Sequence, residues 1–200
     1  NCKWGNSYHS VWFTLCYCLG GKIMPIVLNG NGTVTGLSQL PDSAMAAGSI
    51  LQVVSTTKTD TFSTTSHSFT DITGLSVSIT PTSTSSKIFI IAYVTGQGNV
   101  NARENFKLLR DSTEICQGDA AGSRPRCFGA IYALSDGETP RTTTVNFLDS
   151  PNTTSAITYK IQVSNGNSSG SVHVNRANDD TDSAAHARTA STISVMEVAA

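Results

Sequence analysis

Between residues 50 and 198, apolar residues alternate one by one with Ser and Thr over short runs. Residues 75–80 read Leu-Ser-Val-Ser-Ile-Thr, and residues 193–198 follow a similar pattern near the end of the chain. Strict period-two alternation places successive side chains on opposite faces of a pleated strand. No comparable stretch has the periodicity of an amphipathic helix. The pattern therefore predicts an all-β fold in which many strand faces are covered by hydroxyl groups.

Turn-forming clusters of Gly, Asn, Asp and Ser divide this region into about ten candidate strands. Runs that start roughly 8–12 residues apart, with no helical pattern between them, are typical of a sandwich or a barrel. Residues 87–94 are apolar on both faces, which predicts a strand that is central or that packs against another subunit. The candidate strands are residues 50–58, 67–71, 75–80, 87–95, 105–110, 113–117, 127–134, 141–149, 157–164, 171–175 and 191–198.

Composition divides the chain into three parts. Residues 1–23 are apolar and Cys-rich and contain both tryptophans. Their apolar run is too short to span a bilayer as a helix. This run has the length of a signal-peptide core, but no clear cleavage site follows it. We favour the interpretation that the natural protein starts at Met24 and that residues 1–23 come from an upstream reading frame. Residues 24–49 are predicted to be an extended connector or attachment segment, with a plain solvated linker as the alternative. Residues 50–200 form the predicted β-domain.

The charge of the chain argues against a nucleic-acid partner. Only 14% of the residues are charged, and 13 basic residues stand against 14 acidic ones. Phosphate binding needs a clustered excess of Lys and Arg, and the basic residues here are scattered. Low charge combined with many Ser, Thr, Asn and Gly residues is common in extracellular and virion β-proteins.

No sequence motif of catalysis or cofactor binding is present, so we predict no enzyme, no cofactor, no catalytic residue and no metal site. Asp179, Asp180 and Asp182 could hold a calcium ion through oxygen ligands, but a solvated acidic loop is favoured. Cys116 and Cys127 either pair in an oxidising environment or remain two separate thiols, and the second alternative is favoured. A mid-strand histidine, at position 173, is expected to face solvent.

Four segments carry a family resemblance. They are a Gly-Ser-Ile-Leu-Gln-Val-Val opening, a Thr- and Ser-rich tract that ends in Lys-Ile, a Leu-Asp-Ser-Pro-Asn-Thr-Thr stretch and the terminal alternating strand, at residues 48–54, 79–88, 148–160 and 190–198. In this order they resemble the trimeric C-terminal domains of bacteriophage tail fibres and related virion proteins, particularly of marine and cyanobacterial phages. The resemblance covers residues 48–198 and implies a C1q/TNF-like jelly-roll β-sandwich that assembles as a homotrimer. Residues 24–47 are similar to the attachment leads of such proteins.

The resemblance implies a virion structural protein, assembled in the host cytoplasm and exposed on the particle surface. Residues 24–49 would bind other virion proteins, and distal loops would bind the host surface, with a surface glycan as the expected ligand. No membrane insertion is expected. The loops expected to make this contact are residues 96–104, 118–126, 135–140 and 176–190. The side chains expected at the core or the trimer interface are Phe89, Ile91, Tyr93, Phe147, Leu148 and Tyr159.

Two alternatives remain open. A capsid decoration protein would stabilise the head without binding a host receptor, and its position and copy number on the particle would distinguish it from a fibre. A glycan-degrading tail spike is disfavoured, because such proteins are built from long β-helix repeats and this chain has no internal repeat of fixed period.

Overall fold

The computed structural model describes residues 14–19, 22–28, 34–35, 45–99, 102–132, 139–166 and 169–200, with the first three ranges described by their backbone. The chain divides into two units, Asn1–Met45 and Ala46–Ala200. In the first unit, β1 (Thr14–Leu19), β2 (Lys22–Leu28) and β3 (Val34–Thr35) form an antiparallel sheet in that order. Strands β1 and β2 thus join backbone from the predicted Cys-rich part and the predicted connector. The roles of these two parts stay predictions.

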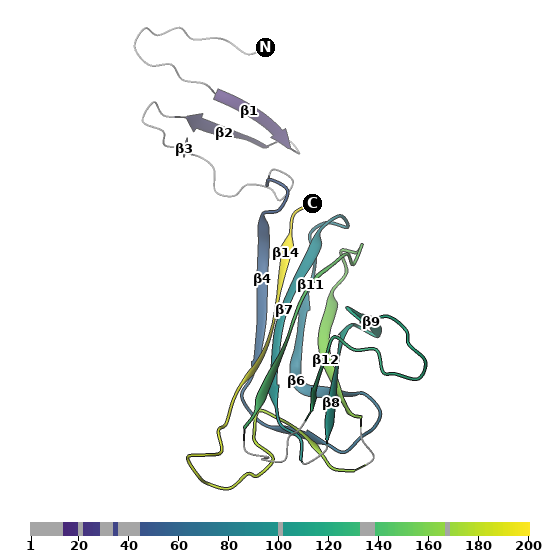
Figure 1. Cartoon of the computed structure of the whole chain (residues 1–200). Helices are drawn as coiled ribbons and strands as arrows, with labels where there is room; N and C mark the ends of the chain where they lie inside the picture. The colour runs from purple at the N-terminus through teal and green to yellow at the C-terminus, as the bar shows by residue number, and fades with distance from the viewer. Residues whose placement is uncertain are drawn as a thin grey trace. The chain divides into compact units, whose positions relative to one another are not determined.

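The second unit contains two antiparallel sheets, seen in Figure 1. We call them the β14 sheet and the β12 sheet. The β14 sheet contains β4 (Ile50–Lys58), β5 (Phe62–Thr64), β7 (Lys87–Gly96), β11 (Arg141–Asp149), β13 (Val172–Val174) and β14 (Ser191–Val198). The β12 sheet contains β6 (Thr70–Ile79), β8 (Arg103–Arg110), β9 (Thr113–Ile115), β10 (Gly129–Tyr132) and β12 (Ile157–Asn165). The described part of the chain holds strands and no helix long and apolar enough to cross a membrane.

The order of the strands identifies the topology. We leave out the three-residue strands β5, β9 and β13 and number the other eight strands one to eight along the chain: β4, β6, β7, β8, β10, β11, β12 and β14. The order of strands is then 1-8-3-6 in the β14 sheet and 2-7-4-5 in the β12 sheet. Every connection between these strands therefore crosses from one sheet to the other, except the hairpin between strands four and five. This interleaving is that of a jelly roll. The prediction of an all-β jelly-roll sandwich with about ten strands is confirmed.

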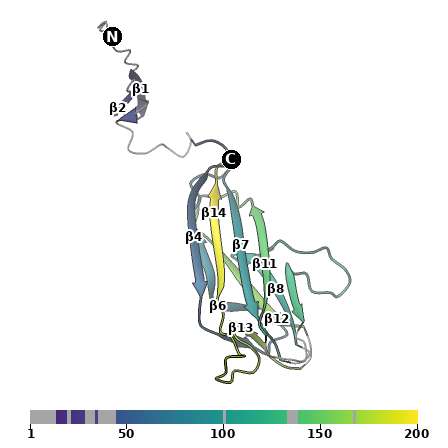
Figure 2. The ribbon, with the colours of Figure 1, turned by 60° about the vertical axis from the view of Figure 1, so that its left-hand side comes forward.

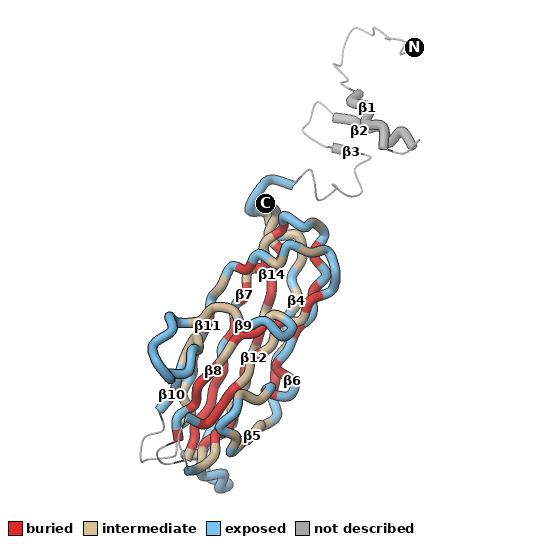
Figure 3. The backbone as a smooth tube through the Cα atoms, turned by 90° about the vertical axis from the view of Figure 1, so that its right-hand side faces the viewer, coloured by how far each residue is buried: buried red, intermediate tan, exposed pale blue. Residues whose placement is uncertain are grey.

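The core lies between the two sheets. Strand β7 turns Ile88 and Ile90 inward, and these side chains are fully buried, as are Val195 of β14, Phe106 of β8 and Tyr159 of β12. Figure 3 shows the buried residues running along β8 and β12. Burying one side chain of this size stabilises a fold by about 1.5–3 kcal/mol before the entropy cost, so the sandwich has enough apolar area for an independent fold.

The ends of the sandwich differ in what they carry. At one end, which we call the proximal end, Gly48 N–H donates to Ala199 O at 2.8 Å and Ala199 N–H donates to Ser49 O at 2.9 Å. Strand β4 runs from there to Lys58, which pairs with Ser191 at the opposite, distal end. Figure 2 shows the C-terminus at the proximal end and several interstrand connections at the other. Residues 46–49 therefore enter the sandwich at the end opposite the distal loops.

Candidate functional site

An apolar row crosses the outward face of the β14 sheet. The strand register aligns Val53 of β4, Met196 of β14, Phe89 of β7 and Leu148 of β11. Val53 is 57% exposed and Leu148 is 53% exposed, while Phe89 and Met196 are half-buried. Ile91, which is 37% exposed, continues the row along β7. Side chains opposite each other on neighbouring strands are close enough to touch, so these residues form one continuous surface.

Hydroxyl groups border this row and hydrogen-bond to one another. Ser55 Oγ lies 2.8 Å from Ser194 Oγ, and Thr57 Oγ1 lies 3.0 Å from Thr192 Oγ1. Thr192 also donates to the hydroxyl oxygen of Tyr93, a side chain that is 39% exposed. A hydroxyl group that already has a partner within its own surface loses less when water is excluded. The free-energy cost of excluding water from these bordering hydroxyl groups is therefore smaller than their polarity suggests.

The two outward faces of the sandwich differ in charge along the aligned row, although Lys87, two positions from Phe89 on β7, shares the outward face and donates to Ser150 Oγ at 2.9 Å. None of the aligned residues described above carries a charge. On the β12 sheet, by contrast, Lys160 pairs with Asp71 at 2.8 Å and Lys107 pairs with Glu114 at 2.6 Å. A continuous apolar area on one face of a domain marks an interaction surface. We call it the apolar face; its members are Val53, Phe89, Ile91, Tyr93, Leu148 and Met196.

The structure separates the interface candidates named from the sequence. Phe89, Ile91 and Tyr93 belong to the apolar face. Phe147 is half-buried and packs against the core. Tyr159 is fully buried inside the sandwich, so its side chain is a core residue in this fold. The interface role of the first three stays a prediction.

The apolar face also contains residues that the sequence did not single out. Val53 and Met196 join it through the register of β4 and β14. Phe147 and Leu148 are adjacent apolar residues, so alternation alone did not show which of the two points outward. The signal that could have found Val53 and Met196 is the hydroxyl pattern beside them, because residues two positions away on the same strands share their face.

Most of the predicted binding loops begin or end at the distal end. Strand β7 ends there at Gly96, β11 begins opposite it at Arg141, and the connection that follows β13 returns to Ser191. Residues 100, 101 and 135–138 of these loops lie outside the described residues. The fourth loop, residues 118–126, is exposed but connects β9 to β10 along the side of the sandwich, as Figure 1 shows. It is therefore not a distal loop.

His173 does not face solvent, and that expectation was wrong. The residue is buried between β5 and the Arg176 side chain, which folds back over it. Its Nδ1 lies 2.9 Å from Ser63 Oγ and 2.8 Å from Arg176 Nη2, and its Nε2 lies 2.9 Å from Ser171 Oγ. Burial, with the nearby Arg176 charge, lowers the pKa of His173 to about 4. The ring is thus a neutral hydrogen-bonding group that ties β13 to its neighbours.

The acidic cluster and the cysteines are placed as follows. Asp180 forms an ion pair with Arg188, with 2.6 Å between its Oδ1 and Arg188 Nη2, and its Oδ2 lies 3.8 Å from Arg176 Nη1. Within the described residues, no group of three His, Cys, Asp or Glu side chains converges as a metal site would require. Cys116 and Cys127 are both free thiols, as favoured from the sequence, and burial raises the pKa of the first.

No protein-family model and no curated protein matches the chain. Solved structures similar to it include two of infectious bursal disease virus. The structure of infectious bursal disease virus strain Gx is 13% identical with a TM-score of 0.38, over 98% of this chain and 50% of that one. The crystal structure of the infectious bursal disease virus VP2 subviral particle is 16% identical with a TM-score of 0.35, over 74% of this chain and 38% of that one. The chain thus spans half or less of their length, and the jelly-roll assignment rests on the strand order.

Proposed function

We propose that the chain is a subunit of a homotrimeric virion structural protein, a fibre tip or short appendage that contacts the host surface. The observation that carries this proposal is the apolar face on one outward sheet, whose six members carry no charge, opposite an outward face that carries ion pairs. Its occupant is a second and a third copy of the same chain, as the resemblance to trimeric fibre domains implies. Three copies related by a closed three-fold axis cover the face without leaving a surface that could continue into a filament.

The layout of the sandwich supports attachment at one end and contact at the other. Residues 46–49 enter at the proximal end, beside Ala199. Residues 24–49, which precede and include this entry in the sequence, bind other virion proteins, while the loops at the distal end remain free. Loops that a rigid scaffold holds away from the attachment point are the usual carriers of binding residues. The proposal assigns no catalysis to the chain.

The solution mass of the full chain tests the trimer. Light scattering coupled to size exclusion should give three times the 21.0 kDa of one chain. Leu148→Lys should give a folded monomer, because closing the interface would bury an unpaired charge from each subunit. The matched control is Ser78→Lys, which places the same charge on the exposed outward face of the β12 sheet and should leave the trimer intact.

Two outcomes would overturn this proposal. A wild-type monomer would leave the apolar face without the proposed partner, and a Leu148→Lys trimer would place the interface elsewhere.

The position of the protein on the particle tests the decoration alternative. Antibody labelling of particles should find the protein at tail or appendage sites, whereas a regular lattice on the head with no host binding would favour a cement protein.

A further inference from the structure

The charged outward face of the β12 sheet is hollowed near its distal end. Asn105 of β8 lies between Ala130 of β10 and Ser164 of β12 in the strand register. Both neighbours are small, so the Asn105 side chain stands between two depressions. One has a volume of about 410 Å³ and the other about 430 Å³, and Asn105 lines both. This is a shaped surface on the side of the sandwich that the proposed trimer leaves exposed.

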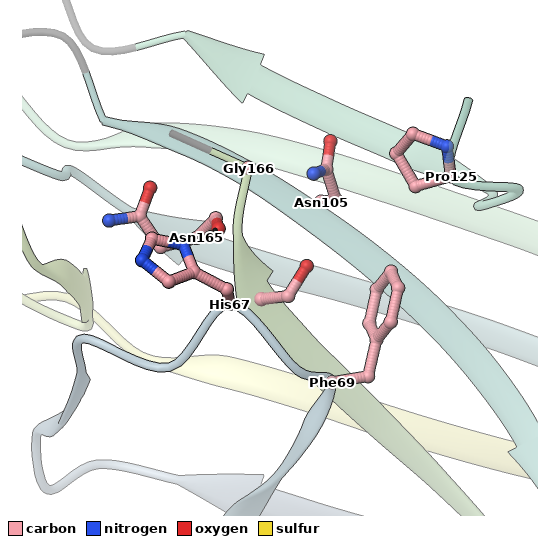
Figure 4. Close-up of a pocket in the computed structure, with 7 residues that line it drawn as sticks. His67, Phe69, Asn105, Pro125, Asn165 and Gly166 are labelled. Carbon is pink, nitrogen blue, oxygen red and sulfur yellow. Dashed lines mark hydrogen bonds between the residues drawn. The ribbon is translucent and has the colours of Figure 1, made fainter. Parts of the chain in front are cut away.

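The first depression, shown in Figure 4, has an apolar and a polar side. The rings of Phe69 and Pro125 border it on one side and His67 borders it on the other. Gly166 keeps the floor open, because a Cβ at this position would lie 2.5 Å from Asn105 Nδ2. Flat apolar rings beside hydrogen-bonding groups suit a ligand that has both C–H faces and hydroxyl groups.

Asn105 has unused hydrogen-bonding capacity. The residue is 9% exposed, and none of the side-chain hydrogen bonds found within the described residues involves its carboxamide. A primary amide offers two donors and one acceptor, and buried polar groups are nearly always satisfied. The amide atoms of Asn105 are not among the buried polar atoms without a partner, so they reach solvent where Asn105 lines the depressions, and they can hydrogen-bond to a ligand there. Vicinal hydroxyl groups match its adjacent donor and acceptor.

A cation without an acidic partner borders the second depression. The Arg103 guanidinium lies 5.6 Å from the centre of the Tyr132 ring, and no ion pair joins it to a carboxylate within the described residues. Lys107, on the same strand, is engaged: it pairs with Glu114 at 2.6 Å and lies 4.1 Å from the centre of the Phe69 ring. A guanidinium held by an aromatic ring presents its N–H groups to an anion in a fixed direction.

From these observations we infer that the two depressions form one saccharide-binding site, in which Asn105 binds ring hydroxyl groups and Arg103 binds an acidic substituent, a carboxylate or a phosphate. The inference deepens the proposed function, because it moves host contact from the distal loops to the β12 sheet and names the ligand class. Each subunit of a trimer would present one such site outward.

The experiment uses an array of saccharides that carry uronate or phosphate groups, together with neutral saccharides of the same backbone, and then titration calorimetry on those that bind. The wild-type protein should bind at least one acidic saccharide. Asn105→Ala should weaken that binding at least tenfold. Arg103→Gln should remove the preference for the acidic over the neutral form. Lys160→Gln removes a cation from the same sheet face outside the depressions and should change neither result.

Thermal unfolding separates a binding role from a structural one. Because the Asn105 amide has no hydrogen-bond partner among the described residues, Asn105→Ala should not lower Tm, whereas loss of a structural amide would lower it. Absence of binding to every saccharide on the array would overturn the site. Saccharide binding that survives both Asn105→Ala and Arg103→Gln would also overturn it, while leaving the proposed host contact intact. A monomeric mass would overturn the proposed trimer and leave the site to be judged by the same titrations.

Discussion

Two glutamates are fully buried in this sandwich, and their surroundings give them opposite charge states. Glu197 Oε1 accepts hydrogen bonds from the backbone N–H and the hydroxyl of Thr82, both at 2.7 Å, and its Oε2 accepts one from Gln52 at 2.6 Å. Burial works to raise the pKa of Glu197, but hydrogen bonds from Gln52, Ser86 and Thr82 outweigh it and lower the pKa. Glu197 is therefore a buried carboxylate that its hydrogen bonds keep ionised.

Glu104 lacks such partners. Neither of its carboxyl oxygens has a hydrogen bond of ordinary geometry, and the same holds for the amide of the buried Gln97. Burial raises the pKa of Glu104 from 4.5 to about 8, and the backbone amide of Gly98 offsets only part of this. The Glu104 carboxyl is therefore protonated in the folded protein at neutral pH. In the unfolded chain it would be ionised.

This difference predicts that Glu104 makes stability fall as pH rises. Between pH 4.5 and about 8 the folded state keeps a proton that the unfolded state has released. The free energy of unfolding should fall there by up to about 1.4 kcal/mol per pH unit. Glu104→Gln should abolish this fall and raise stability at pH 8, as measured by urea unfolding across the range.

His173 acts in the opposite direction over part of that range. Its folded pKa of about 4 lies below its ordinary 6.5, so between these values the unfolded state holds the extra proton and stability rises with pH. The two effects should oppose each other below pH 6.5, and the fall due to Glu104 should stand alone between 6.5 and 8. A wild-type protein whose stability is flat between pH 6.5 and 8 would contradict the buried, protonated state of Glu104.

Tyr159 provides a second residue-scale prediction. Its hydroxyl donates to Asp149 Oδ2 at 2.7 Å inside the sandwich, where Arg110 Nη1 donates to both carboxylate oxygens at 2.9 and 2.8 Å. Tyr159→Phe removes one donor from a buried carboxylate and should destabilise the fold by about 1–3 kcal/mol. Ser76→Ala, which removes an exposed hydroxyl group from β6, is the control and should change stability by less than about 0.5 kcal/mol. Equal effects in thermal unfolding would contradict the buried network.

At the scale of elements, sequence alternation located the long strands well and the irregular ones poorly. The expected strands at 141–149, 191–198 and 50–58 coincide with β11, β14 and β4. Residues 67–71 and 75–80 were expected to be separate strands because Gly74 reads as a turn. Instead β6 continues through it, since Gly74 adopts a φ of +81° and the pairing with β12 shifts register there. A glycine can open a bulge as well as a turn, and local sequence does not distinguish the two.

Local sequence also could not predict the shortest strands or which residues lie beside one another on neighbouring strands, and the reason is different. The three-residue β5 was missed, and the orientation of His173 in the three-residue β13 was wrong, because so few residues hold no full pattern. The surroundings of Asn105 arise from strand pairing with residues about 25 and 60 positions away. By contrast, the outward residues of β7 were identified from the sequence, because a strand apolar on both faces must be covered twice.

The junction of β7 with β13 gives an element-scale prediction. Gly96 ends β7 opposite Val174, and a Cβ at this position would lie 2.5 Å from the backbone oxygen of His173. Because that oxygen belongs to the backbone, it cannot move aside without shifting β13. Gly96→Ala should therefore destabilise the protein by about 1–3 kcal/mol. Gly118→Ala, where a Cβ meets nothing within 4 Å, is the matched control and should be neutral or slightly stabilising in denaturant unfolding.

At the scale of the whole molecule, the two outward faces of the sandwich carry different side chains and suit different functions. The apolar face is suited to contact with further copies, while the β12 sheet exposes its ion pairs, its depressions and Arg103, which forms no ion pair with a described residue. Assembly and ligand binding would then use separate surfaces. A change on one face should leave the intrinsic property of the other unaltered, because the core between them is fully buried and well packed.

This separation predicts how binding depends on assembly. Leu148→Lys should give a monomer whose affinity for a soluble acidic saccharide equals that of each wild-type site, because Asn105 and Arg103 lie on the opposite sheet. On a surface coated densely with the same saccharide, the monomer should bind roughly 10²–10⁴-fold more weakly, since linked sites gain effective concentration that a single site lacks. Surface plasmon resonance at high and low coating density, beside calorimetry in solution, measures both quantities. Equal surface binding by monomer and wild type would show that the trimer does not act through multivalency, and a loss of soluble affinity would show that the two faces are coupled through the core.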